Sequence, residues 1–257
     1  MRILKQILYG LFFLSIVGGI GAGVYFTFLK PAPSCFDNIQ NQLETEVDCG
    51  PASPAEYAQG ATGCLPCELK SLSAEIGEPM AFRLGGATSS AFVEITNPSE
   101  NYGVKSFSYT FDIYSHSNFR LSSVRGETSL YPGESKYIVE SGLEVVHSAI
   151  GDVEFTLGEI SFTYKDEFAP KPAVEISDTE LIRGEEIYYI SGTLTNDSPA
   201  RLRQINVVGV GFGTGNLPVS ASSVLIPELV PFSQEEFRVV LPKGNYQRFE
   251  TYLEISS

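Results

Sequence analysis

The sequence predicts an all-β ectodomain of two tandem β-sandwiches that follows one N-terminal transmembrane helix. Two patterns predict this class: an uncharged apolar run near the start, and a series of short segments after residue 68 in which apolar and polar residues alternate. We expect five parts, namely a head at 1–6, the helix at 7–29, a Cys-rich acidic neck and linker at 30–68, and sandwiches at 69–167 and 168–257.

The apolar run from Ile7 to Leu29 contains 23 residues without a charge. As a helix it is roughly 35 Å long, and a membrane hydrocarbon core is about 30 Å thick. A cleaved signal peptide has a shorter apolar region and ends in small residues, whereas this run ends in Phe28-Leu29-Lys30. We therefore expect a retained anchor. A lipoprotein site at Cys35 is less favoured, because residues 32–34 form a poor lipobox.

Charge predicts the direction of the helix. Arg2 and Lys5 precede it, and after Lys30 no Lys or Arg occurs until Lys70. Six acids lie in that interval: Asp37, Glu44, Glu46, Asp48, Glu56 and Glu68. Because positive residues stay on the cytoplasmic side, we expect a cytoplasmic N-terminus and an extracytoplasmic C-terminal body at the cell membrane.

Gly19 and Gly23 form a GxxxG motif inside the expected helix. Such spacing lets two membrane helices approach closely, which predicts self-association through this face. Glycine is also common in membrane helices in general, so the motif has an alternative explanation.

All four cysteines, Cys35, Cys49, Cys64 and Cys67, lie in the neck. An even number in an exported segment indicates two disulfides, for which three pairings exist. A four-thiolate zinc site is an alternative, although the second close pair of a zinc ribbon is missing. A redox-active Cys64-Leu65-Pro66-Cys67 is another alternative, but it normally follows a βαβ pattern that this chain lacks.

The segment between the first two cysteines resembles a short Cys-rich motif of exported bacterial proteins, C-x-D-G-I-x-N-x-x-E-x-x-V-D-C-G-G. The matching residues are Cys35, Asp37, Ile39, Asn41, Glu44, Val47, Asp48, Cys49 and Gly50. The sequence departs from the motif in three ways: Asn38 replaces the first glycine, Pro51 replaces the second glycine of the final pair, and an insertion precedes the last two cysteines. Calcium prefers hard oxygen ligands, so a Ca²⁺ site is one hypothesis for Asp37, Asn41, Glu44 and Asp48. The alternative is that these side chains cap turns or are solvated.

The body alternates apolar and polar residues in six segments, which we expect to be half-buried strands: 107–113, 137–139, 153–157, 187–190, 205–207 and 237–241. Asn97 and Asn196 are each expected to begin a turn after a strand. Four short matches repeat at an offset of 99 or 100, for example Leu130-Tyr131-Pro132 with Leu229-Val230-Pro231. Halves of about 100 residues have the size of immunoglobulin-like sandwiches.

The second half is similar to small bacterial FxLYD-type sandwich domains. The residues that match are Ile190, Gly192, Leu194, Asn196, Phe212, Pro231, Phe237, Val239 and Leu241, whereas Gly211 and Gly213 depart from the pattern. The resemblance implies a sandwich fold and export, and it implies no enzymatic activity.

Composition and motifs exclude several functions. With a net charge of −14, the surface would repel nucleic acid. His116 and His147 have no ligand-type spacing, and nucleophile-elbow and P-loop motifs are missing from the sequence. The glycine-rich 209–213 falls in a strand–turn–strand passage, where no dinucleotide fingerprint is expected. We therefore predict that the chain is not an enzyme.

The predicted function is that of a membrane-anchored surface or envelope protein that presents β-sandwiches for protein–protein contact or structural display. The expected partners are the lipid bilayer, through 7–29, and another protein, with the end loops 115–118 and 214–217 as candidate contacts. The alternative is an accessory subunit of an envelope machine for pilus assembly, secretion or transport.

Overall fold

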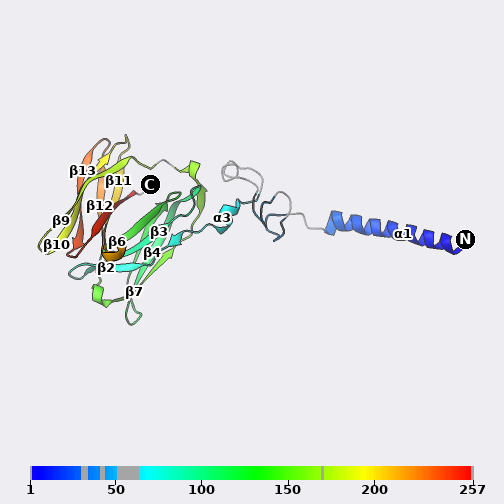
Figure 1. Ribbon diagram of the computed structural model, residues 1–257, viewed down its shortest axis with the longest axis horizontal. Helices are drawn as coiled ribbons and strands as arrows, with labels where there is room; N and C mark the ends of the chain where they lie inside the picture. Colours follow the sequence, from blue (N-terminus) through cyan, green and yellow to red (C-terminus); the bar gives the residue numbers. More distant parts are fainter. Residues whose placement is uncertain (1, 30–33, 41–43, 51–63, 169–170, 256–257) are drawn as a thin grey trace. The chain divides into compact units, whose positions relative to one another are not determined.

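The computed structural model describes residues 2–29, 34–40, 44–50, 64–168 and 171–255. The chain forms two compact units, Met1–Lys70 and Ser71–Ser257 (Figure 1). The prediction of one N-terminal helix followed by an all-β body is confirmed. Most of the linker, 51–63, lies outside the described residues.

The first unit begins with helix α1, Arg2–Val24, which continues as a π-helical turn, η1, Tyr25–Leu29. The segment Lys5–Thr27 is long and apolar enough to cross a membrane. Its large apolar side chains are exposed, with Leu14 at 71% and Leu8 at 68%. A helix that is apolar on all sides and exposed matches a lipid environment better than water. A short helix, α3, Cys67–Ser71, lies at the end of this unit.

The second unit contains two β-sandwiches. Sandwich 1 pairs two sheets. The first consists of β1 (Glu75–Ile76), β2 (Met80–Gly85), β3 (Thr88–Thr96) and β6 (Ser135–Leu143). The second consists of β4 (Tyr102–Ser115), β5 (Arg120–Leu130), β7 (Ile150–Leu157) and β8 (Phe162–Tyr164). Two 3-10 turns, η2 (His147–Ala149) and η3 (Lys165–Glu167), flank the last strands.

Alternation in β4 explains the core of sandwich 1. Phe107, Tyr109, Phe111 and Ile113 are all buried and point to one side of the strand. They pack against buried residues of the facing sheet, such as Ile95. Because successive strand residues point to opposite faces, the period of two in the sequence is sufficient to predict this strand.

Sandwich 2 has the same plan. One sheet contains β9 (Val174–Arg183), β10 (Ile187–Asn196) and β13 (Gln234–Pro242). The other contains β11 (Leu202–Phe212), β12 (Pro218–Leu229) and β14 (Arg248–Ile255), with a 3-10 turn, η4, Thr214–Asn216, between β11 and β12. Its core contains buried Ile190, Leu194, Phe237 and Val239.

The two halves repeat in structure as the sequence predicts. Antiparallel pairing of β3 with β6, β4 with β5 and β4 with β7 recurs as β10 with β13, β11 with β12 and β11 with β14. Asn97 and Asn196 are buried at equivalent corners. The side-chain amide of Asn97 donates to Tyr131 O at 3.0 Å, and that of Asn196 donates to Val230 O at 3.0 Å. Each asparagine therefore ties its own turn to the next hairpin, which is more than the expected local turn role.

A third apolar cluster joins the two sandwiches. Phe82, Phe92 and Val139 of the first sheet of sandwich 1 pack with four residues of sandwich 2: Val208, Val210, Phe212 and Ala221. Ser90 Oγ donates to Ala221 O at 2.6 Å, and Ser223 N donates to Ser141 Oγ at 2.9 Å. Sandwich 1 thus covers both the outer face of β11 and backbone groups of β12.

The interpretation of 209–213 as a strand–turn–strand passage is corrected by β11, which runs without a break to Phe212. The strand is buried on both faces, so its sequence does not alternate in polarity. Val208 and Val210 face sandwich 1, while Gly209 and Gly211 face the core of sandwich 2. A Cβ at Gly211 would lie 2.6 Å from Tyr246 Cδ1, so the glycine leaves room for that ring.

Candidate functional site

The four cysteines form two disulfides, Cys35–Cys64 and Cys49–Cys67. All four sulfurs are used, so neither the four-thiolate zinc site nor a bond within Cys64–Cys67 forms. Cys49 and Cys64 are buried. Closing loops with sequence separations of 29 and 18 contributes roughly 3–4 kcal/mol each in the chain-entropy model. Among the described residues of the neck, only Cys49 and Cys64 belong to the buried apolar set, so the disulfides supply much of its stability.

The acids of the neck hold backbone amides. Asp48 Oδ1 accepts hydrogen bonds from Asp37 N at 3.0 Å and from Asn38 N at 3.1 Å. Asp37 Oδ1 accepts one from Ile39 N at 2.9 Å. Glu44 Oε1 lies 3.2 Å from Cys64 Sγ. Asn41 lies outside the described residues, so the four-residue calcium site stays a prediction, with turn capping established for two of its members.

The helix-packing prediction also stays open. Gly19 and Gly23 lie in α1, and a Cβ at either position would meet nothing within 4 Å. The other glycines of α1 have the same open surroundings, so self-association through this stripe remains a prediction.

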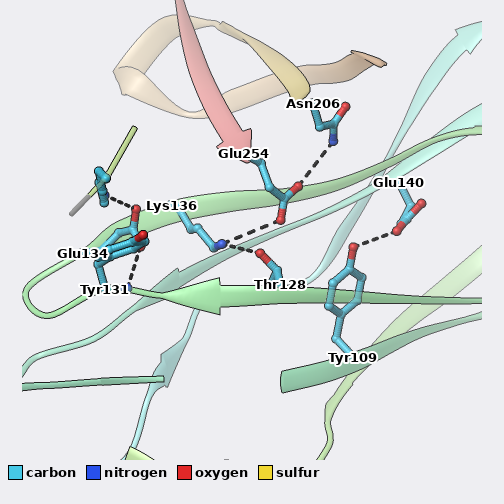
Figure 2. Close-up of polar contacts among 9 residues, drawn as sticks. Tyr109, Thr128, Tyr131, Glu134, Lys136, Glu140, Asn206 and Glu254 are labelled. Atoms are coloured by element: carbon cyan, nitrogen blue, oxygen red, sulfur yellow. Dashed lines mark hydrogen bonds and ion pairs between the residues drawn. The ribbon is translucent and has the colours of Figure 1, made fainter. Parts of the chain in front are cut away.

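A cluster of charged residues lies where the two sandwiches meet (Figure 2). Lys136, at the start of β6, lies 3.7 Å from Glu254 Oε1 of β14, and these side chains are only 11% and 14% exposed. Lys136 Nζ also donates to Thr128 Oγ1 of β5, and Asn206 of β11 donates to Glu254 Oε2 at 3.3 Å. One ion pair thus links strands of both sandwiches.

The linker between the sandwiches completes the cluster. Lys171 Nζ lies 2.6 Å from Glu134 Oε1 and 4.6 Å from the centre of the Tyr131 ring. Glu134 Oε2 accepts a hydrogen bond from Tyr131 N at 2.7 Å. Together with Lys136 and Glu254, these residues line a cavity of about 180 Å³. Its charged side chains pair with one another at this joint between the sandwiches, as the Lys136–Glu254 and Lys171–Glu134 contacts show.

Burial shifts the pKa values around this joint. It lowers the pKa of the Lys136 ammonium, and the charge of Glu254 opposes that shift. Burial raises the pKa of Glu140, and the hydrogen bond from Tyr109 Oη, 2.8 Å long, acts in the opposite direction. Burial also raises the pKa of Tyr109, with the negative charge of Glu140 as the next cause. In each case desolvation of the charged form dominates.

None of these joint residues was among the predicted site residues. Lys136 and Glu254 carry no local signal, because only the packing of the two halves brings them together. The histidines and the candidate contact loops lie elsewhere: His116 and His147 are exposed, and 115–118 and 214–217 lie at the turns before β5 and β12.

No family model and no curated protein matches the sequence. Among solved structures, the crystal structure of red sea bream transglutaminase is similar, with a TM-score of 0.23 and 12% identity. The likeness covers 71% of this chain and 29% of the transglutaminase chain. At that TM-score it supports no inference about fold or activity, and the two resemblances noted in the sequence remain predictions.

Proposed function

We propose that this chain is a non-enzymatic, single-pass membrane protein that displays a rigid pair of β-sandwiches outside the membrane for contact with other proteins. The observation that carries the proposal is the order of features along the chain. A helix of membrane-spanning length and apolarity comes first, and a segment closed by two disulfides follows it. Disulfides persist in oxidising compartments, which supports export of everything after the helix.

The charge distribution supports the same orientation. Arg2 and Lys5 precede the helix, whereas only Lys30 follows it before Lys70. This asymmetry favours a cytoplasmic N-terminus at the cell membrane. The resemblance of 35–50 to a motif of exported bacterial proteins, and of the second half to FxLYD-type domains, agrees with export.

Rigidity supports a display role. The buried cluster of Phe92, Val210 and Phe212, together with the Lys136–Glu254 pair, fixes sandwich 1 against sandwich 2. Two domains held in this way keep their loops at constant separations, so a partner can bind both without ordering a hinge. The charged residues at the joint are engaged with one another, which favours a binding and structural role over catalysis.

Site-directed labelling tests the proposal. Gln6→Cys places a thiol at the N-terminal end of the apolar segment Lys5–Thr27, and Asn245→Cys places one at an exposed position of sandwich 2, while the native cysteines remain in disulfides. In intact cells, a membrane-impermeant maleimide should label the cysteine at 245 and should label the one at 6 only after detergent is added. Labelling at 6 and not at 245, or release of the body from the membrane fraction, would contradict the proposal.

A further inference from the structure

Equivalent turns follow β5 in sandwich 1 and β12 in sandwich 2. The first reads Tyr131-Pro132-Gly133-Glu134 and the second Val230-Pro231-Phe232-Ser233. Each is held by the corner asparagine of its sandwich: Asn97 N donates to Glu134 O at 2.8 Å, and Asn196 N donates to Ser233 O at 2.9 Å. The two turns therefore have the same place and the same partners in the repeated fold.

The third residue of each turn has a positive φ, 65° at Gly133 and 54° at Phe232. Proline followed by a residue with positive φ is the pattern of a type II turn, in which the third position favours glycine. Glycine meets this requirement in sandwich 1 without strain. A bulky side chain at positive φ is an outlier, and such strain concentrates at functional sites.

The Phe232 side chain contributes little to the core, because it is 71% exposed. Val230 in the same turn is 40% exposed. Folding alone would favour a small residue at this position, as in sandwich 1. A strained and exposed aromatic residue is instead typical of an anchor for an interface.

The equivalent turn of sandwich 1 is covered by another segment of the chain. The Phe168 ring packs against Tyr131 at a tilt of 51°, with ring centres 5.4 Å apart, and Lys171 pairs with Glu134 at 2.6 Å. One aromatic and one charged side chain, Phe168 and Lys171, thus fit this surface of the fold.

The corresponding surface of sandwich 2 differs in charge. Arg201 and Arg203 both approach one carboxylate, Glu228, at 3.0 and 3.6 Å. Both arginines are exposed, at 54% and 74%. Two positive charges share one carboxylate, so this pair of arginines carries a local surplus of positive charge, whereas the whole chain has a net charge of −14. Glu228 lies near the end of β12, and Val230 follows the last residue of that strand, Leu229. The Asn196 amide donates to both Ala200 O, at 2.8 Å, and Val230 O, at 3.0 Å, so the residue before Arg201 lies next to the turn.

We propose that Val230 and Phe232, with Arg201 and Arg203 beside them, form a docking site for another protein, which contributes a segment with an apolar or aromatic side chain next to carboxylates. This inference rests on the proposed display function and names its contact surface. The apolar side chain would cover Phe232 and Val230, and the carboxylates would pair with the two arginines.

Site-specific photocrosslinking in the native membrane tests the docking site in the full-length chain. A benzophenone amino acid at position 232 should crosslink to one protein, at an apolar residue with Asp or Glu close by in sequence. The yield should fall several-fold in Arg201→Glu/Arg203→Glu. Position 119 is the matched control, because Phe119 is equally exposed, at 72%, but has no positive φ.

The outcomes separate this inference from the proposed function. A protein captured at 119 and not at 232 leaves the display function standing and overturns the docking site. Adducts at 232 only with a second copy, only with lipid, or with no molecule also overturn it. Failure of the proposed function appears separately, in the labelling of positions 6 and 245.

Stability measurements distinguish an anchor from a folding role. Phe232→Gly should leave the thermal midpoint unchanged or raise it by up to about 3 °C, because strain is relieved. The protein identified by crosslinking at 232 should no longer co-purify with this variant. Gly133→Phe places the strain in sandwich 1 and should lower the midpoint by about 2–6 °C. A lower midpoint for Phe232→Gly would show that Phe232 stabilises the fold, and it would overturn the docking site.

Discussion

The ion pair between Lys136 and Glu254 offers a direct test of how the sandwiches are joined. Lys136→Met removes the ammonium and leaves the Glu254 carboxylate, 14% exposed, without its opposite charge. Breaking a buried pair from one side costs about 3–5 kcal/mol. The 3.7 Å separation and the hydrogen bond from Asn206 to Glu254 place the expected loss near the lower end, at about 3 kcal/mol of unfolding free energy.

Thermal unfolding of the full-length chain in detergent, followed by circular dichroism, measures this loss. For a unit of this size, about 3 kcal/mol corresponds to a fall in the midpoint of about 6–12 °C. Glu254→Gln should also destabilise, because Lys136 then keeps an unpaired charge. The double variant Lys136→Met/Glu254→Gln should be much more stable than the sum of the two single losses predicts, because both charges are gone.

Comparison of the two single variants with the double variant could also contradict this expectation. Additive losses, within about 0.5 kcal/mol, would mean that the two side chains do not interact across the junction. Glu228→Gln is the matched control, since Glu228 is 38% exposed and its arginine partners lie within sandwich 2, so it should change the midpoint little.

Three further predictions concern the buried Glu140, the Cys49–Cys67 disulfide and Phe92 at the junction. The pKa of Glu140 is raised from 4.5, so its stabilising contribution is complete below pH 4.5 and is lost as pH rises through the folded pKa; Glu140→Gln should therefore gain stability relative to the native chain as pH rises from 4 to 7, and a constant difference in chemical-denaturation midpoints would contradict this. Replacing Cys49 and Cys67 by serine should destabilise the neck by roughly 3 kcal/mol and expose 35–70 to limited proteolysis, without changing the unfolding midpoint of the β-body; loss of the midpoint would show that the neck supports the body. Phe92→Ala should cost about 3–5 kcal/mol and lower one cooperative transition, whereas two resolved transitions would mean that the sandwiches unfold independently.

The parts of the fold that the sequence predicts are those with a local pattern. Phe107 to Ile113 alternate because β4 faces a core on one side only, and the uncharged run at 7–29 needs no partner to be recognised. The repeat at a near-constant offset also predicts two similar halves, and the shared strand pairing confirms them.

The junction could not be predicted in this way. Burial of both faces of β11 removes the alternation, so the sequence of 209–213 indicated a strand–turn–strand passage. Only the packing of sandwich 1 against β11 explains why these residues lie in or next to a continuous strand. Lys136 and Glu254 meet only after both sandwiches have formed and packed. The pairing of the cysteines likewise depends on how the neck folds, because the spacing alone permits three arrangements.

If the two sandwiches form one rigid body, the distance between them is fixed, and spin labels can measure it. Spin labels at Ser117→Cys in sandwich 1 and Glu186→Cys in sandwich 2 occupy exposed positions, and the native cysteines are already paired. Double electron–electron resonance on the full-length protein should give a single narrow distribution of distances between the two spin labels. That distribution should broaden when Phe92 is replaced by Ala. A broad distribution in the native chain would mean that the sandwiches move independently, and it would contradict the account.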